Sequence, residues 1–251
     1  MSNKMFQGLR KMALAAAALV VPVAASAGIE PGQVLKTANI DNGKNIYFNG
    51  KGDVPACASC HGQEGLGDDA MGTPRLAGQS FSYIRKQLED FASDKRTDTT
   101  MFVMNANAKG LSEQDRIDVA AYLFHWEQPN KGSDLKAVEE LGQPVGKRYL
   151  GKSIVIYGAP ERGITSCYAC HQYNGRGSFP MYPELTGQKY VYLVNQLKKW
   201  RDESRANDPA AQMRKVAKHM TDEDIHNVAT YLTTAPLTTM GNTFVPHAEV
   251  P

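Results

Sequence analysis

The sequence is short of cysteine, of long apolar runs and of any excess of charge. Its four cysteines all belong to two Cys-x-x-Cys pairs, so none is spare for a further site. No stretch after Gly28 is long and apolar enough to cross a bilayer. Without the three cations of the first 27 residues, 25 Lys and Arg face 26 Asp and Glu, and this balance argues against a nucleic-acid partner.

The one long apolar run lies at the beginning of the chain. Met12 to Ala25 follows a basic segment and ends at Ala25-Ser26-Ala27, whose small residues are typical of a cleavage site. This pattern predicts a secretory signal peptide at residues 1–27, with an uncleaved anchor as the alternative. We therefore expect an exported mature chain, most simply one in a bacterial periplasm.

Both cysteine pairs continue into a histidine, because Cys57-Ala58-Ser59-Cys60-His61 returns as Cys167-Tyr168-Ala169-Cys170-His171. C-x-x-C-H is the attachment signature of c-type haem, in which two thiols bind the vinyl groups and the histidine ligates the iron. The alternatives are a structural disulfide, a zinc half-site, which needs further ligands, and a redox dithiol, which needs no trailing histidine. The doubled motif predicts two covalent haems, with thioether bonds at Cys57, Cys60, Cys167 and Cys170 and iron ligands at His61 and His171.

The second half of the chain repeats the first. Thr73–Gln79 recurs 109 positions later as Tyr182–Gln188. The same offset relates six further residues to their counterparts, namely Tyr83, Gln87, Leu88, Met104, Asp115 and Tyr122. So many matches indicate an internal duplication, and the haem motifs, which are 110 positions apart, indicate one inserted residue.

Each copy has the periodicity of an all-α domain. An apolar stripe over Phe81–Phe91 predicts a helix that the second copy repeats. Ser112 and Thr221, each with an aspartate three residues later, are N-caps of the last helix of each copy. The segments before them, Met104–Leu111 and Met213–Met220, are expected to be loops. The predicted layout has domains at residues 28–124 and 147–235, a linker at 125–146 with a short helix within 134–141, and a tail at 236–251.

Taken together, these features resemble the dihaem cytochrome c4 family, whose domains follow C-x-x-C-H with a P-x-L-x-G-Q loop, an aromatic–Leu helix and a methionine before a capped helix. The resemblance spans about Asn42 to Leu232. It implies two tandem class I cytochrome c domains, all-α and related by a pseudo-twofold axis, with haems close enough to exchange electrons. It also implies redox protein partners, since the family carries electrons towards a terminal oxidase or reductase. The connection from Phe124 to Leu150 is longer than the family's usual linker.

The second axial ligand of each iron distinguishes a carrier from a catalyst. A methionine there occupies the last coordination position of the iron and raises the reduction potential of the haem. The candidates are three methionines in each copy: Met71, Met101, Met104, Met181, Met213 and Met220. The duplication favours Met104 and Met213, which share the offset of 109 and match the ligand position of the family. Met101 is the main alternative ligand. The other alternative is that Met104 and Met213 are not ligands and only fill gaps in the hydrophobic core.

Two prolines and four histidines complete the candidate sites. By resemblance to class I cytochromes, the carbonyls of Pro74 and Pro183 are expected to accept a hydrogen bond from the proximal histidines. The remaining histidines are expected at the surface or in the linker, with His219 as a secondary ligand candidate because it is close to Met213: His125, His219, His226 and His247.

The sequence therefore predicts a periplasmic dihaem electron carrier without substrate chemistry of its own. The alternatives are a cytochrome subunit of a larger dehydrogenase, and a dihaem enzyme such as a peroxidase or thiosulfate dehydrogenase. A peripheral place at the membrane surface stays open. Residues 28–124 hold 10 basic and 13 acidic side chains, whereas residues 147–235 hold 13 and 8. This asymmetry suggests that the second haem meets an acidic partner, and the alternative is a solvated mixed-charge face.

Overall fold

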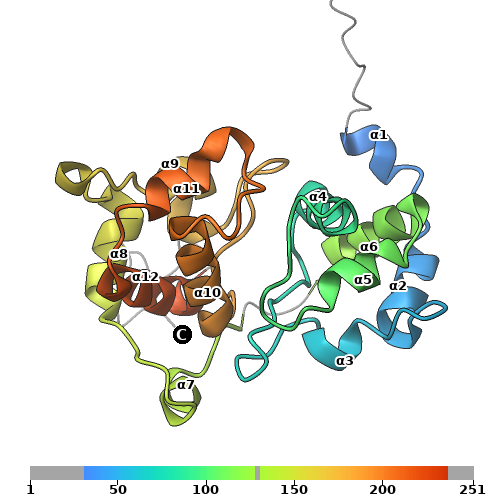
Figure 1. Ribbon diagram of the computed structural model, residues 1–251, viewed down its shortest axis with the longest axis horizontal. Helices are drawn as coiled ribbons and strands as arrows, with labels where there is room; N and C mark the ends of the chain where they lie inside the picture. Colours follow the sequence, from blue (N-terminus) through green and yellow to red (C-terminus); the bar gives the residue numbers. More distant parts are fainter. Residues whose placement is uncertain (1–30, 128–130, 237–251) are drawn as a thin grey trace, which may run out of the picture.

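The computed structural model describes residues 31–127 and 131–236, which form two helical lobes side by side (Figure 1). The described residues contain helices and isolated bridges but no β-strand, which confirms the all-α prediction. Within these residues, no helix combines the length and the apolar character needed to span a membrane. The predicted signal peptide at 1–27 and all but the first residue of the predicted tail lie outside the described residues.

The first lobe is organised around the crossing of two helices. Its helices are α1 (Pro31–Leu35), α2 (Ile40–Asn49), α3 (Ala58–His61), α4 (Phe81–Ala92), α5 (Met104–Lys109) and α6 (Glu113–His125). Helix α6 packs against both α2 and α4. At the crossing with α2, a Cβ on Gly43 would lie 2.1 Å from the carbonyl oxygen of Asp118, so the two backbones approach this closely only because the residue is glycine.

The second lobe repeats this arrangement. Its α-helices are α7 (Leu135–Glu140), α8 (Arg148–Tyr157), α9 (Tyr168–His171), α10 (Tyr190–Arg201), α11 (Gln212–Ala217) and α12 (Asp222–Thr234), with short 3-10 turns at Pro160–Arg162, Tyr173–Gly175 and Pro209–Ala211. Helix α12 packs on α8 and α10. Gly151 of α8 has the role of Gly43, because its Cβ would lie 1.9 Å from the carbonyl oxygen of Asn227.

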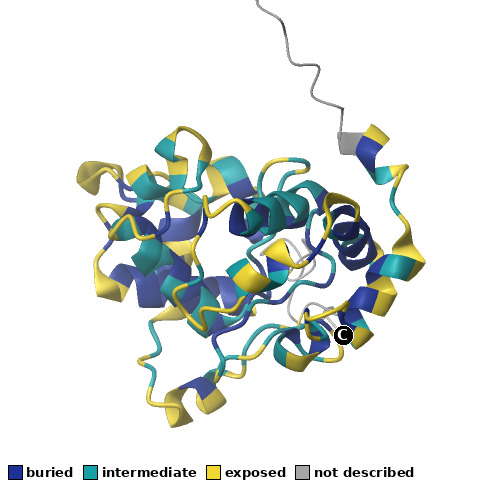
Figure 2. Ribbon diagram, turned by 45° about the vertical axis from the view of Figure 1, so that its right-hand side comes forward, coloured by how far each residue is buried: buried dark blue, intermediate teal, exposed yellow. Residues whose placement is uncertain are grey.

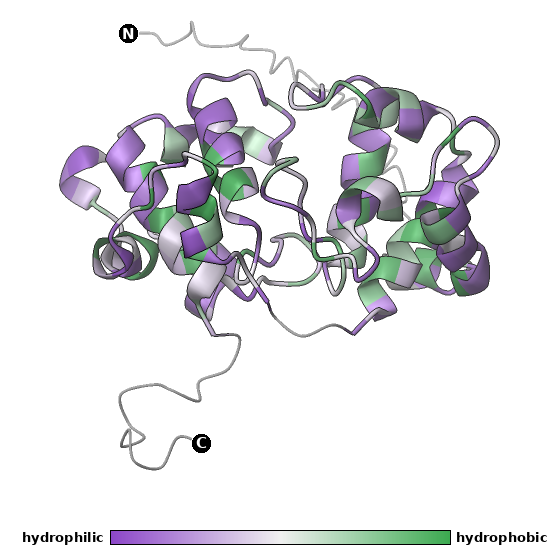
Figure 3. Cartoon of the chain, turned by 90° about the horizontal axis from the view of Figure 1, so that it is seen from below, coloured by the Kyte–Doolittle hydropathy of each residue, from purple (hydrophilic) through white to green (hydrophobic). Residues whose placement is uncertain are grey.

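Each lobe has its own hydrophobic core. The first core gathers Ile46, Tyr47 and Phe81 with one face of α6, and the second gathers Val155 and Ile164 with one face of α12. Buried residues lie inside each lobe, and exposed residues lie on its outer loops and on the outer faces of its helices (Figure 2). The hydrophobic parts of the helices likewise face inwards in both lobes (Figure 3). The duplication is therefore a duplication of complete folding units.

The predicted caps are confirmed, and one predicted pair of loops is wrong. Ser112 and Thr221 each accept from the backbone three residues on, and the aspartate at that position returns the bond, which makes two complete capping boxes. The segments in front of them are not loops, because helices α5 and α11 occupy most of their length. The N–H of Gly110 donates to Ala106 (3.0 Å) and that of Lys218 to Arg214 (2.9 Å), so each segment closes a helical turn.

The segment predicted as a linker packs against the second lobe. Asp134 caps α7 through the N–H groups of Lys136 and Ala137, which confirms the short helix expected there. Val138 is 1 % exposed and belongs to the second core. The hydroxyl of Tyr190 donates to the Pro144 carbonyl. These contacts attach the connection to one lobe, while the domain boundaries themselves stay a prediction.

The lobes dock through two glutamines that have equivalent roles. Gln79 donates to the carbonyl of Glu184 and accepts from its N–H, both at 2.9 Å. Gln188 does the same to Arg75, donating to its carbonyl at 3.0 Å and accepting from its N–H at 2.7 Å. A salt bridge of 2.9 Å also joins Arg75 to Glu184. Each glutamine ends the P-x-L-x-G-Q loop of its own copy and binds the same loop of the other copy, so the contacts follow a pseudo-twofold axis.

Candidate haem sites

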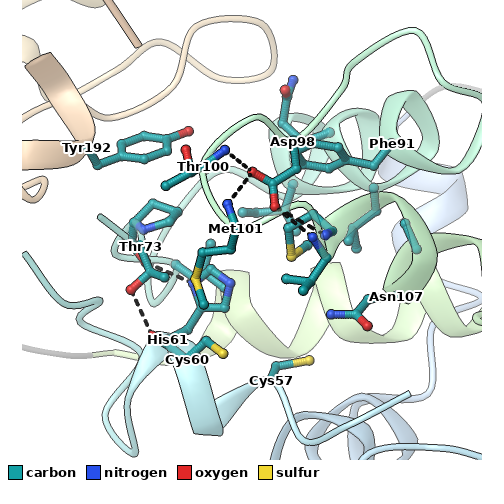
Figure 4. A pocket seen from close by; sticks show the side chains of 18 of the residues that line it. Cys57, Cys60, His61, Thr73, Phe91, Asp98, Thr100, Met101, Asn107 and Tyr192 are labelled. Atoms are coloured by element: carbon teal, nitrogen blue, oxygen red, sulfur yellow. Dashed lines mark hydrogen bonds between the residues drawn. The ribbon is translucent and has the colours of Figure 1, made fainter. Parts of the chain in front are cut away.

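Helix α3 presents the first C-x-x-C-H motif to a cavity of the first lobe (Figure 4). Cys57, Cys60 and His61 all line this cavity, and His61 is 7 % exposed. The Nδ1 atom of His61 lies 3.1 Å from the carbonyl oxygen of Pro74. A carbonyl can only accept, so Nδ1 carries the proton and Nε2 is left as the nitrogen that can bind a metal.

Helix α9 repeats this geometry in the second lobe. His171 is 5 % exposed, and its Nδ1 atom donates to the Pro183 carbonyl at 2.8 Å. The expected carbonyl contacts are thus present in both copies. Burial lowers the pKa of His61 and of His171 because it disfavours the imidazolium, although each carbonyl works against that effect. Both rings are therefore held neutral, which is the form that ligates iron.

The cysteine pairs do not have the properties of a redox dithiol. All four cysteine side chains are partly buried, and none of them forms a disulfide. Burial raises the pKa of Cys57 and of Cys167 to about 11, so both are protonated at neutral pH, whereas a reactive dithiol needs a thiolate. The described ranges also contain no group of three His, Cys, Asp or Glu side chains that could hold a metal ion. Neither the dithiol nor the zinc alternative fits this arrangement.

The first cavity has the lining that a haem requires. One wall is apolar and includes Leu88, Phe91 and Leu123, beside the two thiols and the histidine of the motif. Its polar lining comes from both lobes and includes Arg96 of the first lobe with Tyr192 and Arg205 of the second. A flat, largely apolar group with a charged edge fits such a cavity, so the residues present suit a covalently attached haem.

Two methionines reach the first cavity. Met104, the first residue of α5, is half-buried and lines it. Met101 also lines it, although 36 % of its surface is exposed, and its side chain extends towards His61 (Figure 4). The structure thus brings both candidates to one site, and the choice of Met104 stays a prediction.

In the second copy, Met213 lies on α11 and is half-buried. Met104 and Met213 each precede the N-cap of the last helix by eight residues, so they have equivalent places in the two lobes. Met220 is 4 % exposed and fills the second hydrophobic core, while Met181 is 63 % exposed. These positions leave Met213 as the strongest candidate in this copy.

Asp98 holds the methionine loop of the first copy, and the sequence did not identify it. Its carboxylate accepts from the N–H groups of Thr100 (2.8 Å), Met101 (3.3 Å), Val103 (3.1 Å) and Met104 (3.3 Å). Partial burial would raise the pKa of Asp98, but these four N–H donors outweigh it and lower the pKa. The sequence signal was the Asp-x-Thr pattern of a turn in which the aspartate accepts from the backbone two residues on.

The prediction for the spare histidines is wrong at one position. His125 and His219 are exposed as expected, and His247 lies outside the described residues. His226, in contrast, is 8 % exposed, stacks on Tyr190 and shares a hydrogen bond of 2.7 Å with its hydroxyl. It is buried because it lies on the face of α12 that packs against α10.

Comparisons with known proteins agree with this geometry. The cytochrome c family model matches residues 40–126 and 163–236. The chain is 37 % identical over 196 residues to the thiosulfate dehydrogenase electron acceptor of Stutzerimonas stutzeri, covering 77 % of this chain and 86 % of that protein. It is 31 % identical over 191 residues to cytochrome c4 of Azotobacter vinelandii, covering 73 % and 86 %.

Two solved structures share the fold. Thiosulfate dehydrogenase (TsdBA) from Marichromatium purpuratum matches with a TM-score of 0.71 and 30 % identity, over 79 % of this chain and 41 % of that longer chain. Reduced cytochrome c4 from Pseudomonas stutzeri matches with a TM-score of 0.63 and 26 % identity, over 78 % of this chain and 98 % of that one. With both C-x-x-C-H sites in place, the chain carries two covalent c-type haems, and it belongs to the cytochrome c family as an electron carrier similar to the dihaem cytochromes c4.

Proposed function

We propose that this protein is a periplasmic carrier that accepts electrons from a thiosulfate-oxidising dehydrogenase and passes them towards a terminal oxidase or reductase. A bound haem supplies an iron that cycles between the ferrous and ferric states. The protein attaches, orients and encloses the two haems, and the cavity of the first haem borders the interface between the lobes. The observation that carries the proposal is this pair of equivalent sites, together with the similarity to a thiosulfate dehydrogenase electron acceptor.

The proposed attachment residues are Cys57 and Cys60 for the first haem and Cys167 and Cys170 for the second. The proposed iron ligands are His61 with Met104 and His171 with Met213. Methionine thioether as the sixth ligand leaves no exchangeable position at the iron, which favours electron transfer over small-molecule chemistry. The half-buried methionines at equivalent places before both capped helices support this assignment.

The donor can be tested by stopped-flow absorption. The ferric protein is mixed with a thiosulfate dehydrogenase and thiosulfate, and reduction is followed in the α-band of the haem. We expect reduction of both haems at a rate that greatly exceeds that of an unrelated monohaem cytochrome c under the same conditions. Equal rates for the two acceptors would contradict thiosulfate dehydrogenase as the donor and leave a carrier with another donor.

A second candidate function is a cytochrome subunit of a dehydrogenase complex. The observation that favours it is the TsdBA structure, in which the matched region is only 41 % of one longer chain. Gel filtration of the protein with the dehydrogenase distinguishes the two roles. A stable complex at micromolar concentration supports the subunit, whereas separate elution with retained electron transfer supports the mobile carrier.

The second lobe offers a small cationic surface for an acidic partner. Several cations of this lobe already have partners, since Arg201 pairs with Asp222 (2.6 Å) and Arg214 with Asp208 (2.8 Å). Lys215 and Lys218, by contrast, are exposed on and just after α11 and form no ion pair with the described residues. Both lie close in sequence to Met213, the proposed ligand of the second haem.

We expect Lys215→Glu with Lys218→Glu to reduce the ionic-strength dependence of electron transfer with one partner and leave the other partner unchanged. The physical reason is that exposed charges steer encounter and are screened over about 8 Å at physiological salt. Stopped-flow rates across a salt series measure the effect. Equal changes with both partners, or no change with either, would contradict a cationic docking site at the second haem.

A further inference from the structure

Two arginines are buried between the lobes. Arg96 is 8 % exposed and Arg205 is 5 % exposed. They are 109 positions apart, so each is the counterpart of the other in the duplication. Each guanidinium also lies over an aromatic ring of its own lobe, Arg96 at 4.5 Å from the centre of Phe91 and Arg205 at 4.2 Å from that of Trp200. The pair is therefore a built, symmetric feature of the interface.

The two guanidinium groups converge on the same neutral oxygens. The Gln87 side-chain oxygen accepts from Arg96 (2.7 Å) and from Arg205 (2.9 Å). The Gln196 oxygen likewise accepts from Arg96 (3.0 Å) and from Arg205 (2.8 Å). Arg96 also donates to the Tyr192 hydroxyl (3.2 Å). Because each glutamine oxygen binds both arginines, the two positive charges lie next to each other.

No carboxylate of the described residues forms an ion pair with either arginine, and their partners are amide and hydroxyl oxygens. Burial lowers the pKa of Arg205, and the neighbouring charge of Arg96 adds to this effect. Burial also acts to lower the pKa of Arg96, but the nearby hydroxyls of Tyr192 and Tyr83 outweigh it and raise that pKa. Two adjacent buried cations are unfavourable unless an anion joins them. A carboxylate suits such a pair, because its oxygens accept charge-assisted hydrogen bonds from guanidinium N–H groups.

The cavity that both arginines border supplies the candidate anion. Arg96 and Arg205 line the same cavity as Cys57, Cys60 and His61. A haem carries two propionate carboxylates at the edge away from its vinyl groups, and the vinyl groups are fixed at the cysteines. Tyr192, which accepts from Arg96, lies across the cavity from Cys57 and Cys60 (Figure 4). The cationic pair is thus at the side where a carboxylate edge would lie.

We propose that Arg96 and Arg205 together bind a propionate of the haem attached to Cys57 and Cys60. An arginine of the second lobe then holds the cofactor of the first. Two consequences follow. The positive pair stabilises the ferrous over the ferric haem and so raises its potential. The haem carboxylate in turn neutralises the interface, so attachment of the first haem strengthens docking of the lobes.

The test is a spectroelectrochemical titration of the holoprotein and its Arg205→Gln variant, with Lys95→Gln as the control. Lys95 is exposed and adjacent to Arg96, so the control removes one charge from the surface instead of the interface. The first haem is identified as the transition that is missing in a Cys57→Ala/Cys60→Ala variant. We expect Arg205→Gln to favour its ferric form about tenfold, a fall of about 59 mV for one electron, and Arg205→Lys to retain most of the potential.

A second readout separates charge pairing from a merely structural role. Loss of the arginine raises the pKa of the propionic acid towards neutrality, so the potential of Arg205→Gln becomes dependent on pH around neutrality while that of the natural protein stays flat. Should Arg205→Gln fail to fold, Arg96→Gln tests the same contact from the first lobe. A first-haem potential that changes no more than in Lys95→Gln and gains no pH dependence would overturn the proposal.

Discussion

Replacing Asp115 by asparagine removes a buried, charge-dependent contact of the first lobe. Asp115 is 4 % exposed and accepts from Lys51 (2.6 Å), Asn42 (3.1 Å) and the Ser112 hydroxyl (2.6 Å). Burial alone would raise the pKa of Asp115, but these donors outweigh it and lower the pKa to about 2. The carboxylate is therefore more stable in the folded protein than in the unfolded chain.

The contribution of the Asp115 charge to the free energy of folding follows from its lowered pKa. Lowering the pKa from 3.8 to about 2 corresponds to about 2 kcal/mol of folding free energy, at about 1.36 kcal/mol for each tenfold change. Because the folded-state pKa is depressed, this stability is fully present above about pH 4 and is lost as the pH falls towards 2. We expect Asp115→Asn to cost about 2 kcal/mol at neutral pH and to differ little from the natural protein near pH 2.

Guanidinium unfolding of the holoprotein, followed by far-ultraviolet circular dichroism at several pH values, measures this difference. Glu113→Gln is the matched control, since Glu113 is an exposed acid in the first turn of the same helix. The control is expected to change the free energy of unfolding by less than about 0.5 kcal/mol. Equal losses of unfolding free energy in the two variants would show that the Asp115 carboxylate has no special contribution to stability. So would a loss in Asp115→Asn that does not become smaller as the pH falls.

Three further changes test the interface, the methionine loop and the iron ligands. Gln79→Ala or Gln188→Ala removes the two hydrogen bonds that the glutamine makes with the backbone of the other lobe, and we expect a loss of about 1–3 kcal/mol in thermal unfolding with wider separation of the lobes in small-angle scattering. Phe102 has a φ of 62° and is 74 % exposed, so Phe102→Asn should stabilise the protein by about 1 kcal/mol in urea unfolding. Met104→His and Met213→His should each lower the potential of one haem only, as measured by redox titration, and an unchanged potential in Met104→His would favour Met101 as the ligand.

The features that the sequence predicted are those that depend on short spacing. The C-x-x-C-H motifs and the capping boxes at Ser112 and Thr221 lie within a few residues of what they contact and recur in the second copy. The carbonyls of Pro74 and Pro183 lie 13 and 12 residues from the histidines that they accept from, and these contacts were expected from the family resemblance. Residues close together in the sequence determine these structures. Because each pattern occurs in both halves of the chain, its presence in one half supports its interpretation in the other.

The features that the sequence did not predict depend on contacts between distant segments. Gln79 and Gln188 look like ordinary loop glutamines, and only docking of the lobes brings each to the other copy's backbone. Arg96 and Arg205 resemble solvated charges in the sequence, and only the docking of the two lobes buries them. His226 was expected at the surface because it has no counterpart in the first copy, but its place on α12 buries it. In each case tertiary packing outweighs the preference of the residue type.

Carbon monoxide binding to the ferrous holoprotein reports whether either iron has an open coordination position. If methionine is the sixth ligand of both irons, neither iron binds a small molecule and the chain transfers electrons only. A titration with carbon monoxide at neutral pH, followed in the Soret band and compared with the haem content of the sample, reports any open iron. We expect no spectral change at either haem on the timescale of seconds. Rapid formation of a carbon monoxide complex at one or both irons would contradict the account and favour a dihaem enzyme.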